Sequence, residues 1–224
     1  MVEIISVHID KTAGMLLCDI LKQVYGQNLV HVIWKGQASY KFEDKLNEPV
    51  PLQTRVIHGA FPVSYYENRF IDAKRVVWVR NPVERLISYY FYLLAHRLPF
   101  PNGLKEMNIL EFAAHHQICN QMSKMIGTLS SFFFVSIYEF LSDDLYCLQK
   151  LQGWPKIAIS PINVNPFPNY DEEKKAMLGN KYLVSDIKSL NNLDIQLYQQ
   201  ALNVRESRLK TARLEEIKKE LVSP

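Results

Sequence analysis

The sequence predicts an α/β fold with a central parallel sheet flanked by helices. Short apolar, β-branched runs alternate along the chain with longer segments in which apolar residues recur at helical spacing. One of the short runs, Lys74–Arg80 ("KRVVWVR"), carries consecutive apolar residues, as strands that are buried on both faces do. Such alternation is typical of βαβ units, which build parallel sheets.

Three strand–helix units carry this prediction. Strand Val2–His8 is followed by a turn of small residues and a helix that stops at Gly26. A second strand, Thr54–Phe61, has a glycine break. The third strand, Lys74–Arg80, ends at an Asn-Pro pair, and Pro82 opens the helix that follows.

The rest of the chain continues the pattern without a visible domain boundary, so we expect one domain over residues 1–224. A loop spans Leu98–Gly103, and a charged tail over 191–222 reads as one or two amphipathic helices. Between them we expect a helix over 109–127, a strand over 132–140, a helix over 141–153 and a proline-rich loop over 154–170.

Composition excludes several classes of protein. The chain has 224 residues, 48% of them hydrophobic, and a net charge of +3, so neither nucleic-acid binding nor a membrane surface is indicated. Cys18, Cys119 and Cys147 fit neither a disulfide framework nor a zinc site, and we expect no metal. We see no signal peptide and no apolar run of the roughly 18–20 residues that cross a bilayer. A cytoplasmic protein without a transmembrane segment is the expectation, unless an anchor has been removed.

The segment "VHIDKTAGM" places a lysine and small residues directly after the first strand. A strand–turn–helix unit directs backbone N–H groups and a helix dipole outward, which favours phosphate. Lys11 would add a positive charge to such a cradle. The alternative is a surface lysine in an ordinary loop. A kinase is disfavoured because Lys11 precedes Gly14, whereas the usual P-loop lysine follows a glycine.

A second candidate anion site follows the third strand. Arg80 stands at the end of that strand, and Ser88 lies two turns into the next helix. An arginine fork suits phosphate because it donates two parallel hydrogen bonds. Two anion sites on two strand–helix units suit a nucleotide with phosphates at both ends.

At these residues the chain resembles the PAPS-dependent sulfotransferases, in particular the carbohydrate O-sulfotransferases. "HIDKTAG" is similar to their HIPKTAG motif and "RNPVERLISYY" to their RDPVERxxSxY motif. "HGAFP", "CNQMSKMIG", "FVSIYEFLSDDLYCLQKLQGWP" and "NNLDIQLYQQA" resemble further family segments in the same order. The resemblance implies a P-loop-like three-layer fold and transfer of a sulfuryl group from PAPS to a hydroxyl, with PAP as the product and no metal.

The resemblance also implies a role for each matched residue. Lys11–Met15 would hold the 5′-phosphosulfate, with backbone N–H groups from Thr12, Ala13 and Gly14, and Lys11 would stabilise the leaving phosphate oxygen. Arg80 and Ser88 would hold the 3′-phosphate that distinguishes PAPS from ATP.

The acceptor would be a carbohydrate or glycolipid hydroxyl, and His58 is the candidate base that takes its proton. A hydrogen-bonded core histidine is the alternative for His58, and His8 is expected to be structural. His115 and His116, expected in a helix, and Glu139 are left open. The acceptor site would come from loops 34–48, 98–107 and 157–170. Aromatics that could stack on sugars, or simply pack, are Trp34, Tyr40, Tyr65, Tyr66 and Phe100.

Several positions depart from the family pattern. Asp10 replaces a proline, Met15 replaces a hydroxyl residue, and Ala60 stands where some relatives have a second histidine. Asn81 for Asp and Lys124 for Arg are milder changes. Because of these departures, a second hypothesis stays open: the chain is a homologue that binds PAPS, PAP or a partner without transferring sulfate. The third hypothesis is a P-loop kinase.

Overall fold

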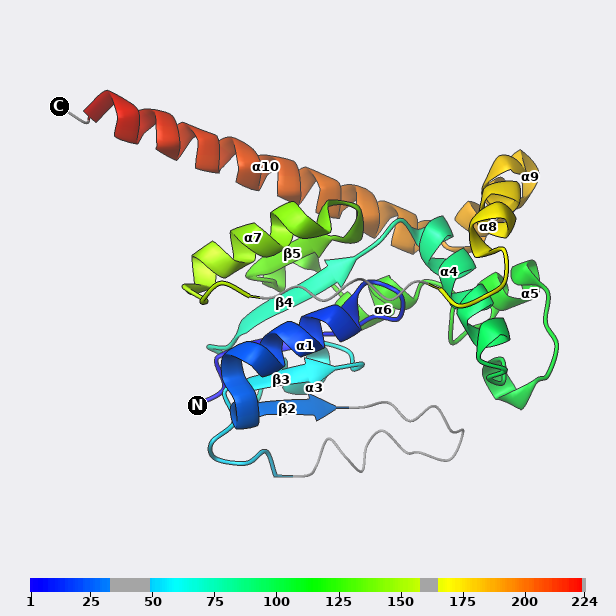
Figure 1. The fold of residues 1–224 in the computed structure, drawn as a ribbon, viewed down its shortest axis with the longest axis horizontal. Helices are drawn as coiled ribbons and strands as arrows, with labels where there is room; N and C mark the ends of the chain where they lie inside the picture. The colour runs from blue at the N-terminus through cyan, green and yellow to red at the C-terminus, as the bar shows by residue number, and fades with distance from the viewer. Residues whose placement is uncertain (33–48, 158–164, 223–224) are drawn as a thin grey trace.

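The computed structural model describes residues 1–32, 49–157 and 165–222. Within them the chain forms a five-stranded parallel sheet in the order β2-β3-β1-β4-β5 (Figure 1). The strands are β1 (Ile4–Val7), β2 (Leu29–Val32), β3 (Val56–Gly59), β4 (Lys74–Val79) and β5 (Phe134–Ile137). The predicted α/β class with a central parallel sheet flanked by helices is confirmed.

Helices connect and cover these strands. They are α1 (Gly14–Tyr25), α3 (Ser64–Glu67), α4 (Pro82–Ala95), α5 (Ile109–Ala114), α6 (Gln121–Ile126), α7 (Leu141–Gln152), α8 (Tyr170–Gly179), α9 (Lys181–Leu190) and α10 (Asn192–Val222). Gly26 ends α1 with a φ of 54°, and Pro82 is the first residue of α4, as the sequence predicts.

The two faces of the sheet pack against different helices. Strand residues such as Ile4 and Val76 lie in one apolar cluster with α1 and α7. Their chain neighbours Ile5 and Val77 lie in another, with α6 and α10. Successive side chains of a strand point to opposite faces, so a strand that is covered on both faces needs an apolar residue at nearly every position. This is why the run in β4 is continuous.

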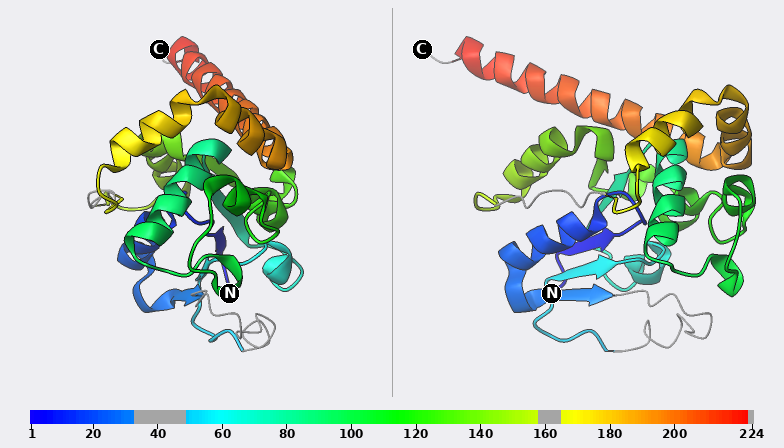
Figure 2. Two further views of the ribbon diagram at one scale, coloured as in Figure 1. Left: turned by 90° about the vertical axis from the view of Figure 1, so that its right-hand side faces the viewer. Right: turned by 45° about the vertical axis from the view of Figure 1, so that its right-hand side comes forward.

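A third apolar cluster lies beyond the carboxyl ends of the strands. It joins α4, α5, α8 and α9, which gather at one end of the molecule (Figure 2). The strand order places β1 between β3 and β4. The chain leaves β1 toward the β2 edge and leaves β4 toward the β5 edge, so the ends of β1 and β4 flank the position where open α/β sheets bind ligands.

Three elements differ from the sequence-based expectation. β2 was not expected, and it is a short strand at the edge of the sheet. The single helix expected over 109–127 is two helices, because His115 is extended and Asn120 adopts a φ of 53°. Helices α8 and α9 occupy 170–190, where the sequence pattern predicts none.

The tail forms one helix, α10, which crosses the sheet beside α7 (Figure 1). Its arginines reach the buried carboxylate of Asp144, which accepts hydrogen bonds at 2.8 Å from Arg205 Nε and Arg208 Nη2. The same carboxylate accepts a hydrogen bond from the Ile137 N–H at 2.9 Å. These bonds fasten α10 to β5 and α7. In the part of the chain that the structure describes, no helix combines the length and the apolar character needed to cross a bilayer.

Candidate functional site

The turn between β1 and α1 is strained. Lys11 and Ala13 adopt φ values of 66° and 68°, in the left-handed region that residues with a Cβ rarely occupy. Each such residue costs about 1–2 kcal/mol. The Thr12 hydroxyl donates to the Ile9 carbonyl at 2.9 Å and fixes the turn from inside. Strain of this kind clusters at functional sites, because the surrounding fold must hold it in place.

The turn leads into a helix whose N-terminus is open. Within the described ranges, no side chain caps α1 at Ala13, and Met15 in its first turn is 48% exposed. The first N–H groups of a helix have no partners inside the helix and carry the positive end of its dipole. The end of α1 therefore presents unsatisfied donors to solvent, as an anion site requires.

Gly14 has a structural role that the sequence analysis did not identify. The sequence favours small residues here because a ligand approaches the backbone closely. In the structure, a Cβ added to Gly14 would overlap the His8 ring. The glycine therefore lets the start of α1 pack directly against the histidine that follows β1.

Lys11 and Arg80 are brought together as the sequence predicts. Arg80 Nη1 donates to the Lys11 carbonyl at 3.2 Å, which joins the end of β4 to the turn after β1. Arg80 is 6% exposed, its guanidinium lies 4.2 Å from the Tyr138 ring centre, and its Nε has no hydrogen-bond partner among the described residues. A buried donor without a partner is costly unless a ligand completes it.

The environment of Lys11 favours an incoming anion. Its ammonium lies 4.1 Å from the centre of the Tyr92 ring. Burial, and then the charge of Arg80, lower the pKa of Lys11 to about 8, against the opposing effect of Asp10. Glu84 lies 3.7 Å from Arg80 Nη2 and balances part of that charge. A phosphate would stabilise the charged form of Lys11 and offset its desolvation.

The Asp10 carboxylate, an unfavourable neighbour for a phosphate, lies beside the Tyr89 hydroxyl of α4. Burial, followed by the charge of Asp10, raises the pKa of Tyr89. Ser88, which precedes Tyr89 in α4, is 4% exposed, and its carbonyl accepts a hydrogen bond from Asn165 Nδ2 at 3.2 Å.

That the Ser88 hydroxyl binds the 3′-phosphate stays a prediction.

His58 is not placed as expected for a base. Its ring lies on the face of the sheet under α1 and is 0% exposed. Its Nδ1 is 2.8 Å from the Ser6 hydroxyl, and its Nε2 has no hydrogen-bond partner within the described residues. Burial, and then the charges of His8 and His31, hold the pKa of His58 well below its usual value, and the Gly14 backbone opposes them only partly. The ring therefore does not face an acceptor in this structure.

Two further histidines surround His58. The His8 ring centre is 5.5 Å from that of His58, with 12° between the ring planes, and the His31 ring centre is 5.3 Å away. One ring nitrogen from each of the three lies within 4.8 Å of the others. His31 escaped the sequence analysis because β2 was not predicted, although the alternation in "LVHV" was a signal for it.

The other candidate bases have structural partners. Glu139 accepts a hydrogen bond from the Asn81 N–H at 2.9 Å, directly after Arg80, so it fits the role of a structural acceptor. The Asn81 side chain caps α4 by accepting from the N–H groups of Val83 and Glu84. His115 and His116 follow the end of α5 rather than lying in a helix, and His115 Nε2 is 3.0 Å from Asn102 Nδ2.

Two of the weaker motifs meet each other. Asn120 of "CNQ" accepts hydrogen bonds from the Leu193 and Asp194 N–H groups at 3.0 and 3.1 Å. Asp194 of "NNLD" accepts from the Ser123 N–H and hydroxyl, each at 2.8 Å. This junction ties α6 to α10. Arg85 lies against it, 3.7 Å from the Asp194 carboxylate, and its Nε and Nη2 have no hydrogen-bond partner among the described residues.

The expected acceptor loops are only partly described. Trp34, Tyr40 and the segments 33–48 and 158–164 lie outside the described residues. Among the other aromatics, Tyr66 and Phe100 are buried, at 4% and 3% exposure, and only Tyr65 is exposed. Packing is thus the role of Tyr66 and Phe100.

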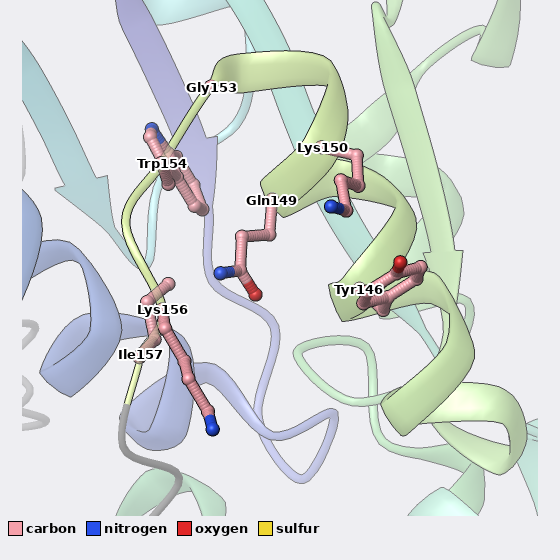
Figure 3. A pocket seen from close by; sticks show the side chains of 7 residues that line it. All are labelled: Tyr146, Gln149, Lys150, Gly153, Trp154, Lys156 and Ile157. Carbon is pink, nitrogen blue, oxygen red and sulfur yellow. The ribbon is translucent and has the colours of Figure 1, made fainter.

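A shallow hollow of about 590 Å³ lies at the end of α7 (Figure 3). Its side chains come from α7 and from the segment after it. They are Tyr146, Gln149, Lys150, Gly153, Trp154, Lys156 and Ile157. None of the predicted nucleotide-binding residues lines the hollow, whereas Ile157 is the first residue of an expected acceptor loop.

Comparison with known proteins gives a limited result. No protein-family model matches the chain, and no curated protein matches it. Among solved structures, a sulfotransferase from Alicyclobacillus acidocaldarius is 13% identical, with a TM-score of 0.43 over 89% of this chain and 99% of that one. Mouse sulfotransferase SULT7A1 complexed with PAP is 14% identical, with a TM-score of 0.38 over 79% and 63%. Likenesses this distant carry no argument about activity.

Proposed function

We propose that the chain binds PAPS between β1 and β4 and transfers its sulfuryl group to a hydroxyl, most simply of a carbohydrate or glycolipid. One observation carries the proposal, namely the contact between the Arg80 guanidinium and the backbone of the strained turn at Lys11. This turn leads into an uncapped helix. The motif resemblance, rather than the distant structural matches, supplies the identity of the nucleotide.

In the proposed reaction, the bond between sulfur and the bridging 5′-phosphate oxygen breaks, and a bond forms between sulfur and the acceptor oxygen. The leaving oxygen gains negative charge. Lys11, still mostly protonated at pH 7 because its pKa is about 8, would stabilise that charge. The N–H groups of Thr12, Ala13 and Gly14 and the side chain of Met15 would surround the 5′-phosphate, and Arg80 with Ser88 would bind the 3′-phosphate.

The proposal leaves the proton acceptor unassigned. A general base must come within hydrogen-bond distance of the proton that it takes, and the His58 ring is fully buried. His58 stays a sequence-based prediction, and a base role would require β2 or α1 to move away from its ring.

The same burial favours a second candidate function. A homologue that binds PAPS or PAP without transferring sulfate needs the nucleotide site but no accessible base. The missing hydroxyl at Met15 and the carboxylate of Asp10 fit this alternative equally well. The two candidates make the same prediction for nucleotide binding and differ only in turnover.

Calorimetry with PAP, ADP and AMP tests the shared part of the proposal. We expect PAP to bind at least about tenfold more tightly than ADP, because one additional charged hydrogen-bonded pair contributes about 1.5–3 kcal/mol. Equal affinity for the three nucleotides would remove the PAPS assignment, and a preference for ATP with magnesium would favour a kinase. Labelled PAPS incubated with polysaccharides, glycolipids and small alcohols then separates an enzyme from a silent binder.

A further inference from the structure

The three histidines His8, His31 and His58 are brought together by the register of the sheet. In the pairing of parallel strands, His58 of β3 stands opposite Ser6 of β1 on one side and His31 of β2 on the other. His8 follows Ser6 by two positions, so it is directed to the same face. The cluster therefore results from strand order and pairing rather than from the rotamer of a single side chain.

The central nitrogen of this cluster lacks a partner. His58 Nε2 is fully buried and forms no hydrogen bond of good geometry within the described residues, and the nearby Gly14 backbone offsets only a small part of the effect of burial on this ring. Leaving such a group unsatisfied costs about 1–3 kcal/mol. Nearly all buried polar atoms have a partner, so an exception requires an explanation, and binding of a metal ion is one of the few available.

The outer nitrogens of two rings are already fixed. His58 Nδ1 lies 2.8 Å from the Ser6 hydroxyl, and His31 Nδ1 lies 3.5 Å from the Cys18 sulfur. Histidines that bind metals usually use their second nitrogen in this way, which sets the tautomer and the direction of the free lone pair.

We propose that His8, His31 and His58 bind one divalent metal ion of the zinc type under the start of α1, with His58 Nε2 as the central ligand. Three neutral imidazoles suit zinc and leave a fourth position for water or another ligand. The ligand atoms lie within 4.8 Å of one another. Tetrahedral zinc with Zn–N bonds of about 2.0–2.1 Å needs them roughly 3.4 Å apart, so the ligand nitrogens would approach one another by up to about 1.4 Å. His8 and His31 are only partly buried.

The position of this site separates it from the nucleotide site. Gly14 packs on the His8 ring, so the ion would lie behind the strained turn and not at the phosphates. It would hold α1 to β1, β2 and β3. It would also occupy the Nε2 lone pair of His58 and exclude that nitrogen as a base. The inference is independent of sulfuryl transfer, because it rests on the histidine geometry alone.

The test is calorimetric titration of Zn²⁺ into the full chain after treatment with a chelator. We expect one equivalent to bind and to raise the melting temperature, and Co²⁺ in its place to give the visible absorption of a tetrahedral complex. Ser6→Ala, which removes an outer partner of His58, should weaken the affinity by about 10–100-fold. His31→Gln and His8→Gln each remove a ligand and should weaken it by more than about 100-fold, beyond that range.

His116→Gln is the matched control, because it removes an exposed histidine outside the cluster. It should leave zinc affinity unchanged. Circular dichroism of each metal-free variant establishes that it is folded. If His8→Gln unfolds, His31→Gln still tests the proposal, because His31 lies on a partly exposed edge strand. The proposal is overturned if wild type binds no stoichiometric zinc, if folded His31→Gln binds it as tightly as wild type, or if His116→Gln abolishes binding.

Discussion

Two junctions in this protein use polar residues in opposite ways. The β1–α1 turn (Asp10–Gly14) holds two residues in left-handed conformations and leads into an uncapped helix. The α6–α10 junction (Asn120–Ser123 with Asn191–Asp194) directs its side chains at backbone N–H groups of the neighbouring segment. Both regions stood out in the sequence as family-like motifs.

The difference shows how a polar motif can be assigned to structure or to ligand binding. At the α6–α10 junction, the acceptors of Asn120 and Asp194 are paired within the protein, so the motif is explained by the fold. A buried arginine with unpartnered nitrogens lies at each junction, Arg80 at the turn and Arg85 beside Asp194, so this feature does not separate them. The β1–α1 turn differs in its two left-handed residues and its uncapped helix, which the fold does not explain. An incoming anion would resolve both the open helix end and the clustered charge.

The largest expected effect is at the α6–α10 junction. Asp194→Ala removes the carboxylate that faces Arg85 at 3.7 Å, where both side chains are 0% exposed. We expect unfolding free energy to fall by about 3–5 kcal/mol, because the change leaves a buried charge without its partner. Urea denaturation measures it.

Asp143→Ala is the control for that change. Asp143 also pairs with an arginine of α10, but its side chain is 76% exposed. The cost there should stay within about 0.5 kcal/mol. If Asp194→Ala and Asp143→Ala lowered the free energy of unfolding by similar amounts, the structural role that we assign to the α6–α10 junction would be wrong.

The second effect concerns the β1–α1 turn. Arg80→Ala should weaken PAP binding by about 1.5–3 kcal/mol, the range for hydrogen bonds to charged groups. Arg80→Lys keeps the charge but loses the fork, and it should recover only part of the affinity. Calorimetry at constant salt gives the values. If Arg80→Ala has no cooperative melting transition in the absence of ligand, Arg80 is required for folding, and its role is structural.

A pH series provides the third test, because Lys11 has a pKa of about 8. The second pKa of a phosphate monoester is near 6, so the ligand charge is constant above pH 7. Deprotonation of Lys11 between pH 7 and 9 should weaken PAP binding by about 1 kcal/mol, since one pKa unit corresponds to about 1.4 kcal/mol. A Lys11→Ala variant with the same pH profile as wild type would remove Lys11 from the site.

The stability of the free protein should change in the other direction. The pKa of Lys11 is about 8 in the folded chain, against 10.5 for a lysine in water, so the unfolded chain binds more protons in this interval. The contribution of Lys11 to stability therefore rises as the pH rises from about 8 toward 10.5. Comparing wild type with Lys11→Ala by denaturation across that window isolates this contribution.

The smallest effect comes from relief of strain. Ala13 adopts a φ of 68°, so Ala13→Gly should stabilise the fold by up to about 1 kcal/mol. The gain is the energy of the left-handed conformation that glycine avoids, minus the larger conformational entropy that glycine loses on folding. The control is Ala176→Gly on the exposed face of α8, where the same substitution should destabilise by about 0.5–1 kcal/mol. Effects of the same sign at both positions would argue against strain in the β1–α1 turn.

Local sequence determined much of the central fold. The glycine at 26, the proline at 82 and the apolar run in β4 located α1, α4 and a buried strand, because each acts through its own backbone or its nearest neighbours. The convergence of Lys11 and Arg80 was also predictable, since parallel strands bring their carboxyl ends to one edge.

Tertiary structure alone decided the features that depend on distant partners. The helix expected over 109–127 is broken at Asn120 because that residue bonds to Leu193 and Asp194, far along the chain. The burial of His58 and its grouping with His8 and His31 depend on the position of β2, an edge strand of four residues whose pairing with β3 the sequence does not specify. The spacing of residues along the chain indicates which of them share a helix or strand. Strand order and register determine which helices and strands are in contact, and order and register follow from the packing of the whole sheet.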